Sequence, residues 1–237
     1  MGRIKIDYEL KIDSKALFGD WAVPLNDLLA SDYMYNLIVF LEEIYTDRDL
    51  VITPFKKQVF RVFQEAKYRD LKVVVLADGP YKTFKNNGLA LANKESLQHF
   101  SPELMKVKEC IEKTVYGGFK LTFDPTLETW TDQGVLPLNT SQTADISKGK
   151  SHSVYWRRFT REIIKTINNN KKDIVFILLG AEAGYFERYI DRDKHQIYKF
   201  HHPIHSVKRM QDWNCPCFRA TNAFLARKFG SEHGIEW

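Results

Sequence analysis

Polar side chains that could do chemistry follow three buried strands of the sequence, at the points where the strands end. Asp78 and Tyr81 come after the aliphatic run VVVL, Asn139 ends the run GVLPLN, and His202 follows the run IYKFH. In open α/β sheets the carboxyl ends of parallel strands meet at one edge, and ligands bind there. We therefore predict a site that combines an acid, a phenol, an amide and an imidazole.

The turn Asp78-Gly79-Pro80 also has a simpler interpretation. Gly79 can adopt backbone angles that other residues avoid, and Pro80 fixes the φ that follows. An Asp in such a turn commonly accepts hydrogen bonds from nearby backbone. Asp78 is therefore either an acid of the site or a residue that forms the turn.

The elements that must position these residues are strands that alternate with helices. The chain has 237 residues, of which 44% are hydrophobic, and fits one domain over residues 1–237, with residues 1–20 as an N-terminal extension. Alternating strands and helices predict an α/β fold with three layers, α/β/α, around a central, mostly parallel, four-stranded sheet. Helices are expected at 34–44, 56–66, 102–114, 153–168 and 217–227, and strands at 73–76, 133–139, 173–180 and 195–201.

Charge and hydropathy narrow the class of protein. The formal net charge of +5 is mild and fits a DNA, RNA or lipid surface equally well. No apolar run is long enough to span a bilayer, and the first residues carry charges where a signal peptide needs an apolar core. We expect a soluble, cytoplasmic protein that does not bind membranes.

Cysteine and histidine patterns do not predict a metal site. Cys110, Cys215 and Cys217 are too few for a disulfide framework, and we expect free thiols. His201, His202 and His205 lie close together in the sequence, but no Cys or carboxylate accompanies them at the spacing of metal ligands.

Four motifs, in the same order, resemble those of the family-1 uracil-DNA glycosylases. VVVLADGPYK at 73–82 resembles the family's VVILGQDPYH, and GLAL at 88–91 resembles GLAF. WTDQGVLPLN at 130–139 resembles WxxQGVLLLN, and HPIHS at 202–206 resembles HPSPLS. With the matching C-terminal IEW, the resemblance extends from Trp21 to Trp237.

The resemblance implies a reaction and roles for individual residues. Enzymes of this family flip a nucleotide out of DNA and hydrolyse its N-glycosidic bond without a cofactor. By this resemblance, His202 donates a hydrogen bond to the pyrimidine O2 and Tyr81 crowds the C5 position. Asn139 takes the place of the amide that binds the pyrimidine edge, and rotation of its amide would suit a cytosine-like edge.

Departures from the family pattern fall in the same motifs. Aligned without gaps, the family's catalytic Asp falls on Gly79, its Gln on Asp78 and its leading Gly, beside the base, on Ala77. An acid is therefore present one residue early, where extended backbone aims it to the opposite side unless the turn is rebuilt. Leu91 replaces the Phe that stacks on the base, which leaves space in the pocket.

The resemblance also implies a surface for double-stranded or single-stranded DNA, bound by a monomer. The family's wedge residue appears as His205, with Ile204 beside it, and Glu103 replaces a phosphate-binding Ser for which Ser101 could compensate. A solvated charged loop is the alternative interpretation. The predicted DNA contacts are Lys82, Ser101, Ile204, His205, Ser206, Lys208 and Arg209, with further positive charge from Lys148, Lys150 and Arg157.

Three functions are compatible with these features. The first is a DNA glycosylase for a pyrimidine larger than uracil, such as hydroxymethylated or glucosylated cytosine in phage DNA, where excision would be a defence. The second is a uracil-DNA glycosylase of base excision repair in which Asp78 is the acid. The third is an inactive relative that binds DNA or a replication partner, with Asp78 only forming the turn.

Overall fold

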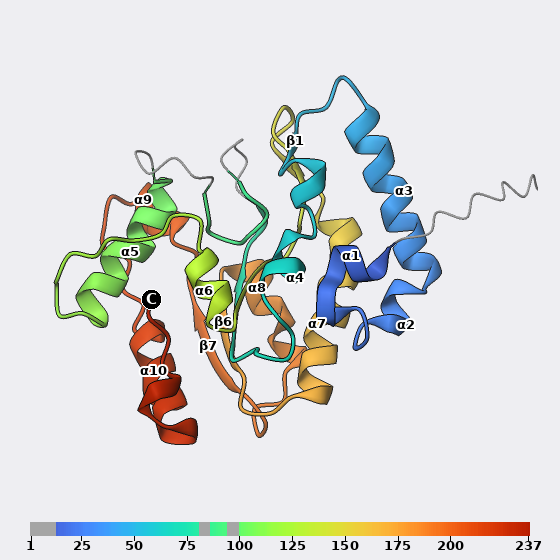
Figure 1. The fold of residues 1–237 in the computed structure, drawn as a ribbon. Coiled ribbons are helices and arrows are strands. Elements are labelled where there is room, and N and C mark those ends of the chain that lie inside the picture. Colours follow the sequence, from blue (N-terminus) through green and yellow to red (C-terminus); the bar gives the residue numbers. More distant parts are fainter. Residues whose placement is uncertain (1–12, 81–85, 94–99) are drawn as a thin grey trace, which may run out of the picture.

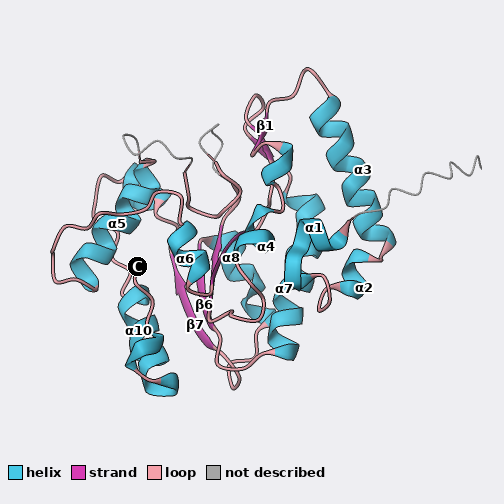
Figure 2. Cartoon of the chain, viewed as in Figure 1, coloured by secondary structure: helices cyan, strands magenta, loops and turns pink. Residues whose placement is uncertain are grey.

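A four-stranded parallel sheet forms the centre of the molecule (Figures 1 and 2). The computed structural model describes residues 13–80, 86–93 and 100–237. The strand order is β3-β2-β6-β7, and every neighbouring pair is parallel, as the sequence predicts. The strands are β2 (Val73–Ala77), β3 (Val135–Asn139), β6 (Val175–Leu179) and β7 (Gln196–Phe200).

Burial on both faces explains why the first three of these strands are almost continuously apolar. Every residue of β2, β3 and β6 is buried, which is typical of a parallel sheet that is covered on both sides. Strand β7 lies at the edge of the sheet, and its residues are mostly half-buried.

Helices cover both faces of this sheet, and Figure 1 shows the two groups on its two sides. One group contains α5 (Pro102–Thr114), α6 (Glu128–Asp132), α9 (Ile204–Lys208), α10 (Cys217–Phe229) and η4 (Ser231–His233). The other contains α1 (Ser14–Phe18), η1 (Gly19–Trp21), α2 (Asn26–Leu29), α3 (Asp32–Thr46), η2 (Lys56–Gln58), α4 (Arg61–Glu65) and α7 (Ser153–Asn170). Helices α8 (Ala181–Tyr185) and η3 (Phe186–Tyr189) follow β6.

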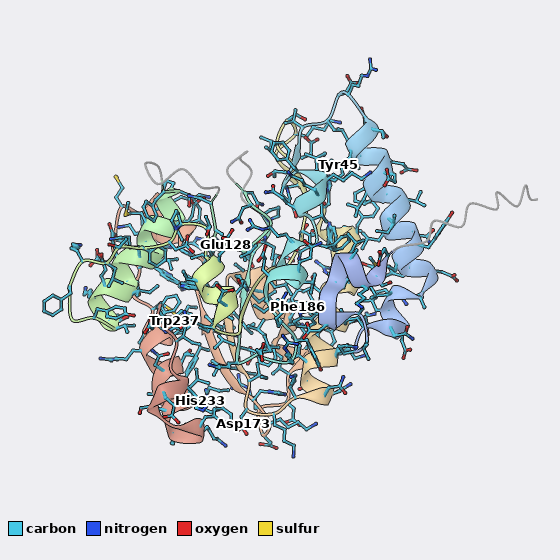
Figure 3. The ribbon with its side chains drawn as sticks, viewed as in Figure 1. Tyr45, Glu128, Asp173, Phe186, His233 and Trp237 are labelled. Atoms are coloured by element: carbon cyan, nitrogen blue, oxygen red, sulfur yellow. A yellow bond between two sulfur atoms is a disulfide. The ribbon has the colours of Figure 1, made fainter. Side chains whose placement is uncertain are left out.

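Aromatic clusters hold each group of helices together. The ring of Trp237, labelled in Figure 3, lies 5.0 Å from that of Trp130 and 4.9 Å from that of Phe218. In the other group, the ring of Phe18 lies 4.9 Å from that of Phe60 and 5.2 Å from that of Phe63. Phe18 belongs to α1, so this residue and the adjacent Leu17 tie part of the expected N-terminal extension to the core.

Two local features differ from the sequence-based prediction. The helix expected at 56–66 is interrupted between η2 and α4, because Val59 and the adjacent Phe60 are both buried and Phe60 has non-helical backbone angles. A second sheet, β1-β4-β5, was not predicted, since its strands have two residues each and show no alternating pattern. These strands are β1 (Ile52–Thr53), β4 (Ala144–Asp145) and β5 (Lys150–Ser151).

The sulfur chemistry also differs from expectation in part. Cys110 is a free, buried thiol, as predicted. Cys215 and Cys217 form a disulfide, so the expectation of free thiols is wrong for this pair. Both cysteines lie at the start of α10, and the short segment between them brings their sulfur atoms together. Among the described residues, no group of His, Cys, Asp and Glu is arranged to hold a metal ion, and no helix could cross a membrane.

Candidate active site

The carboxyl ends of the four parallel strands form one rim, and the register places the site residues along it. Asn139, the last residue of β3, pairs with Ala77 of β2, which pairs with Leu179 of β6. Leu179 in turn pairs with Phe200 of β7, and His202 follows two residues later. Neighbouring strands lie about 4.8 Å apart. Asn139 ends one outer strand of this sheet, and His202 follows the other outer strand.

The side-chain amide of Asn139 is available to a ligand. Asn139 is 3% exposed, and its backbone carbonyl accepts a hydrogen bond from the Gln142 amide at 2.6 Å. Among the described residues, the side chain that hydrogen-bonds to Asn139 does so at its backbone carbonyl and not at its side-chain amide. The amide can therefore offer a donor and an acceptor to the edge of a base.

His202 is held as a neutral imidazole with a defined tautomer. Its Nδ1 accepts a hydrogen bond from the backbone N–H of Ile204 at 3.3 Å, so the ring proton of the neutral form is on Nε2. Burial, reinforced by the nearby His205, lowers the pKa of His202 from 6.5 to about 4. Near neutral pH, His202 can therefore donate a hydrogen bond from Nε2 without carrying a charge.

We expect this buried imidazole to make the protein less stable as the pH falls. Its pKa is lower in the folded than in the unfolded chain, so between pH 6.5 and 4 the unfolded chain binds the proton and the folded one does not. The stability from this group is complete above pH 6.5, and about 3 kcal/mol is lost on acidification to pH 4. Urea unfolding at pH 7 and pH 4.5 should show a smaller loss for His202→Gln than for the wild type.

The adjacent, exposed His201 provides the control for this measurement. His201→Gln should lose as much stability between the two pH values as the wild type. An unchanged loss in His202→Gln would contradict the buried neutral state of His202.

Asp78 does not direct its carboxylate along the rim. Its Oδ1 accepts a hydrogen bond from the backbone N–H of Ala183 at 2.7 Å, and the N–H groups of Glu182 and Ala181 also donate to the carboxylate. Burial raises the pKa of Asp78, while these three backbone donors lower it. The carboxylate thus caps the first turn of α8, where unpaired N–H groups need an acceptor.

Gly180 makes room for this cap. It has a φ of +109°, and a Cβ at this position would overlap the Asp78 carboxylate. We expect Asp78→Ala to lower the free energy of unfolding by about 1–2 kcal/mol, because the cap is lost. Gly180→Ala should lower the free energy of unfolding, measured by urea denaturation, by about 2 kcal/mol or more in the wild type. In a protein that already carries Asp78→Ala, the same substitution should lower it by about 1 kcal/mol less.

Gly117→Ala is a suitable control for this cycle. Gly117 also has a positive φ, +61°, but a Cβ there would meet no atom of the described part of the chain within 4 Å. Gly117→Ala should lower the free energy of unfolding by the same amount in the wild type and in the Asp78→Ala protein. Equal costs of Gly180→Ala in both backgrounds would contradict the contact between Gly180 and the carboxylate.

Gly79 occupies the position of the acid expected from the motif, and its surroundings leave room for a side chain. Its backbone N–H donates to Thr140 Oγ1 at 3.1 Å, and its φ is +46°. A Cβ on Gly79 would meet only Ser151 Oγ, at 3.9 Å, among the described residues. Thr140 and Ser151 therefore frame the space beside Gly79, although the motifs did not identify them as site residues.

Two of the remaining residues predicted for base recognition are buried. Ala77 ends β2 and is buried, and Leu91 is 3% exposed with a φ of +68°. Tyr81 and Lys82 lie outside the described residues.

Three of the seven residues predicted to contact DNA are exposed, and two of the others are buried. His205, Lys208 and Arg209 are exposed, whereas Ile204 is half-buried. Ser206 is 5% exposed, which leaves its hydroxyl little access to a phosphate. Ser101 caps α5 by accepting a hydrogen bond from Leu104 N–H at 3.1 Å.

Two of the three residues predicted to add positive charge to the DNA-binding surface are exposed. Lys148 and Arg157 are exposed, and the side chain of Lys150 lies outside the described part of the structure. Burial raises the pKa of Glu103, the residue that replaces the family's phosphate-binding Ser. Met210 was missed by the sequence analysis; it is 93% exposed and follows α9 directly.

Comparisons with known proteins give relatives over almost the whole chain. It is 31% identical to a uracil-DNA glycosylase of Fusobacterium nucleatum over 220 residues, 92% of this chain and 94% of the relative. It is 32% identical to the enzyme of that name from Acinetobacter baylyi over 229 residues, 95% of this chain and 93% of the relative. No family model matches the chain.

Solved structures share the fold. The crystal structure of mimivirus uracil-DNA glycosylase superposes with a TM-score of 0.81 at 21% identity and covers 96% of this chain and 90% of its own. A structure from Nitratifractor salsuginis superposes with a TM-score of 0.60 at 14% identity, over 89% and 94% of the two chains. The chain therefore belongs to the uracil-DNA glycosylase family and is a DNA glycosylase, a hydrolase of N-glycosyl bonds.

Proposed function

We propose that this enzyme flips a pyrimidine nucleotide out of DNA and excises a base larger than uracil, leaving an abasic site. The observation that carries the proposal is the displaced acid. The Asp78 carboxylate is bound to the backbone of α8. At Gly79, where the motif predicts an acid, a Cβ would meet only Ser151 Oγ among the described residues, at 3.9 Å. The site therefore keeps Asn139 and His202, which bind the base, but differs from the family motif in lacking a carboxylate at position 79.

Asn139 and His202 supply the chemistry in this proposal. As the bond between C1′ and the base breaks, negative charge develops on the base, and a hydrogen bond from His202 Nε2 to the pyrimidine O2 stabilises it. Asn139 binds the Watson–Crick edge through its amide, in either orientation. Water then adds to C1′ of the sugar, one of its protons is released, and the departing base takes up a proton.

Small side chains around the base support a larger substrate. Gly79 has no side chain where the family has Asp, and Leu91 stands where the family has a flat Phe. Ala77 works in the opposite direction, since it adds a methyl group where the family has Gly. Hydroxymethylated or glucosylated cytosine in phage DNA is a candidate with the required size and edge. Excision of such a base would damage the phage genome, which would make the enzyme a defence rather than a repair protein.

Uracil excision is the second candidate, and the relatives favour it. The enzymes from Fusobacterium nucleatum and Alkaliphilus oremlandii, 31% and 33% identical to this chain, are named uracil-DNA glycosylases. Asn139 and His202 would serve this reaction equally well.

Mass spectrometry of the released bases distinguishes these functions. The purified protein is incubated with three DNAs: a duplex containing uracil, unmodified DNA, and phage DNA with hydroxymethylated and glucosylated cytosine. Release of modified cytosine alone, abolished by Asn139→Ala, is the expected result. Release of uracil alone would establish the second candidate, and DNA binding without release of any base would contradict both.

A further inference from the structure

Met210 combines full exposure with an unfavourable backbone conformation. It is 93% exposed, and its φ is +51°. Residues with a Cβ rarely adopt this region, and a large apolar side chain gains nothing from contact with water. An outlier of this kind suggests a function that offsets its cost.

The hydrogen bonds around Met210 show how it is held outward. Its backbone N–H donates to Val207 O at 3.1 Å, and the N–H of Gln211 donates to Ser206 O at 3.1 Å. This pair of bonds is a Schellman motif, which ends a helix with a left-handed residue that is usually Gly. The motif at the end of α9 therefore fixes the position from which the Met210 side chain extends into solvent.

Helix α9 connects this side chain to the active site. The helix begins at Ile204, whose N–H donates to His202 Nδ1, and it lies at the same end of the molecule as β1 in Figure 1. His205, Lys208 and Arg209, on the same short segment, are exposed. A cationic segment that presents one apolar side chain beside a base-binding site has the chemistry of a DNA wedge.

We propose that Met210 is the wedge that enters the base stack of the duplex when the target nucleotide leaves it. The inference rests on the proposed function, since it requires a nucleotide to be flipped out of DNA. The flexible, polarizable thioether can fill the vacated space between neighbouring bases. It takes the role that the resemblance implies for His205 and Ile204, because Ile204 is half-buried and His205 is a polar imidazole, whereas Met210 is apolar and 93% exposed.

A fluorescent duplex tests this role without knowledge of the excised base. The probe contains a tetrahydrofuran abasic analogue with 2-aminopurine as its neighbour, so that a wedge at the abasic position changes the stacking and fluorescence of 2-aminopurine. Wild type and Met210→Leu should change the fluorescence equally, and Met210→Ala should lose most of the change at saturating protein. Val23→Ala, at another residue that is 83% exposed, should behave as wild type.

Met210→Gly should not lower the thermal stability of the protein but should reduce its activity on duplex DNA. Met210→Gly should leave Tm unchanged or raise it by up to about 4 °C, because Gly suits the left-handed position. Base release from duplex DNA should fall at least about tenfold, as expected if the wedge offsets part of the unstacking energy. Release from single-stranded DNA should change less than about twofold, because no stack has to be opened.

The possible results distinguish a failure of the wedge role of Met210 from a failure of the proposed glycosylase function. Probe binding by wild type with an equal fluorescence change in Met210→Ala would overturn the wedge and leave the proposed function intact. Failure of the wild type to bind the abasic duplex would overturn both.

Discussion

Gly79→Asp should raise excision of uracil from DNA by at least about tenfold over the wild-type protein. The substitution places a carboxylate beside the space framed by Thr140 and Ser151, where it can stabilise positive charge on the sugar or orient water. The backbone tolerates the change, because Asp is among the residues that adopt a positive φ. Within residues 13–80, 86–93 and 100–237, only Ser151 Oγ lies within 4 Å of the new Cβ.

Single-turnover release of uracil from a duplex measures this gain. Gly79→Asn, which has nearly the same shape but no charge, and Gly79→Ala are the controls, and neither should increase the rate. A Gly79→Asp protein that folds normally and releases no more uracil than Gly79→Ala would contradict the assignment of this space to the missing acid.

Asn139→Ala and His202→Ala should each reduce base release by about 10²–10³-fold, with the effect mainly on kcat. The loss follows from the removal of a group that is positioned in a buried site and binds the base more strongly as charge develops on it. His202 is 7% exposed with its Nε2 proton fixed by the Ile204 contact, and Asn139 is 3% exposed, with the Gln142 amide bonded to its backbone carbonyl and not to its side chain.

The adjacent histidine, His201, provides the control for His202→Ala. His201→Ala alters an exposed imidazole next to His202 and should change kcat less than about threefold. A loss in Asn139→Ala or His202→Ala that appears only in KM would show that these groups contribute to binding alone, and would contradict their role in the departure of the base.

The rim of the sheet was predictable because it depends on patterns that are local in the sequence. The apolar runs that precede Asp78 and end in Asn139 are long enough to indicate buried strands, and parallel order brings their carboxyl ends together. The relative position of Asn139 and Ala77 then follows from the register.

The direction of the Asp78 carboxylate could not be predicted in this way. Its hydrogen-bond partner, Ala183, is 105 residues away in the sequence, and the contact requires Gly180 to leave the space open. A general expectation that Asp78 caps backbone was available, but not which backbone. The sequence likewise does not predict the sheet that brings Ser151 close to Gly79, because its strands have only two residues each and show no alternation of apolar and polar residues.

The role of Met210 also depends on structure that the sequence does not display. Nothing in the residues KRMQD indicates that a helix ends there with a left-handed Met. The preference of that position for Gly makes the exposed Met noticeable only once the hydrogen bonds of Ser206 and Val207 are known.

The central claim is that base release depends on Asn139 and His202 while Asp78 is a structural cap, and Asp78→Asn tests it most directly. Asn retains an oxygen that can accept from the α8 backbone but has no charge. On the base that the wild type releases, single-turnover rates for Asp78→Asn should stay within about threefold of wild type. A fall of about 10²-fold or more, in a variant with wild-type stability, would show that the Asp78 carboxylate acts in the reaction and would contradict this account.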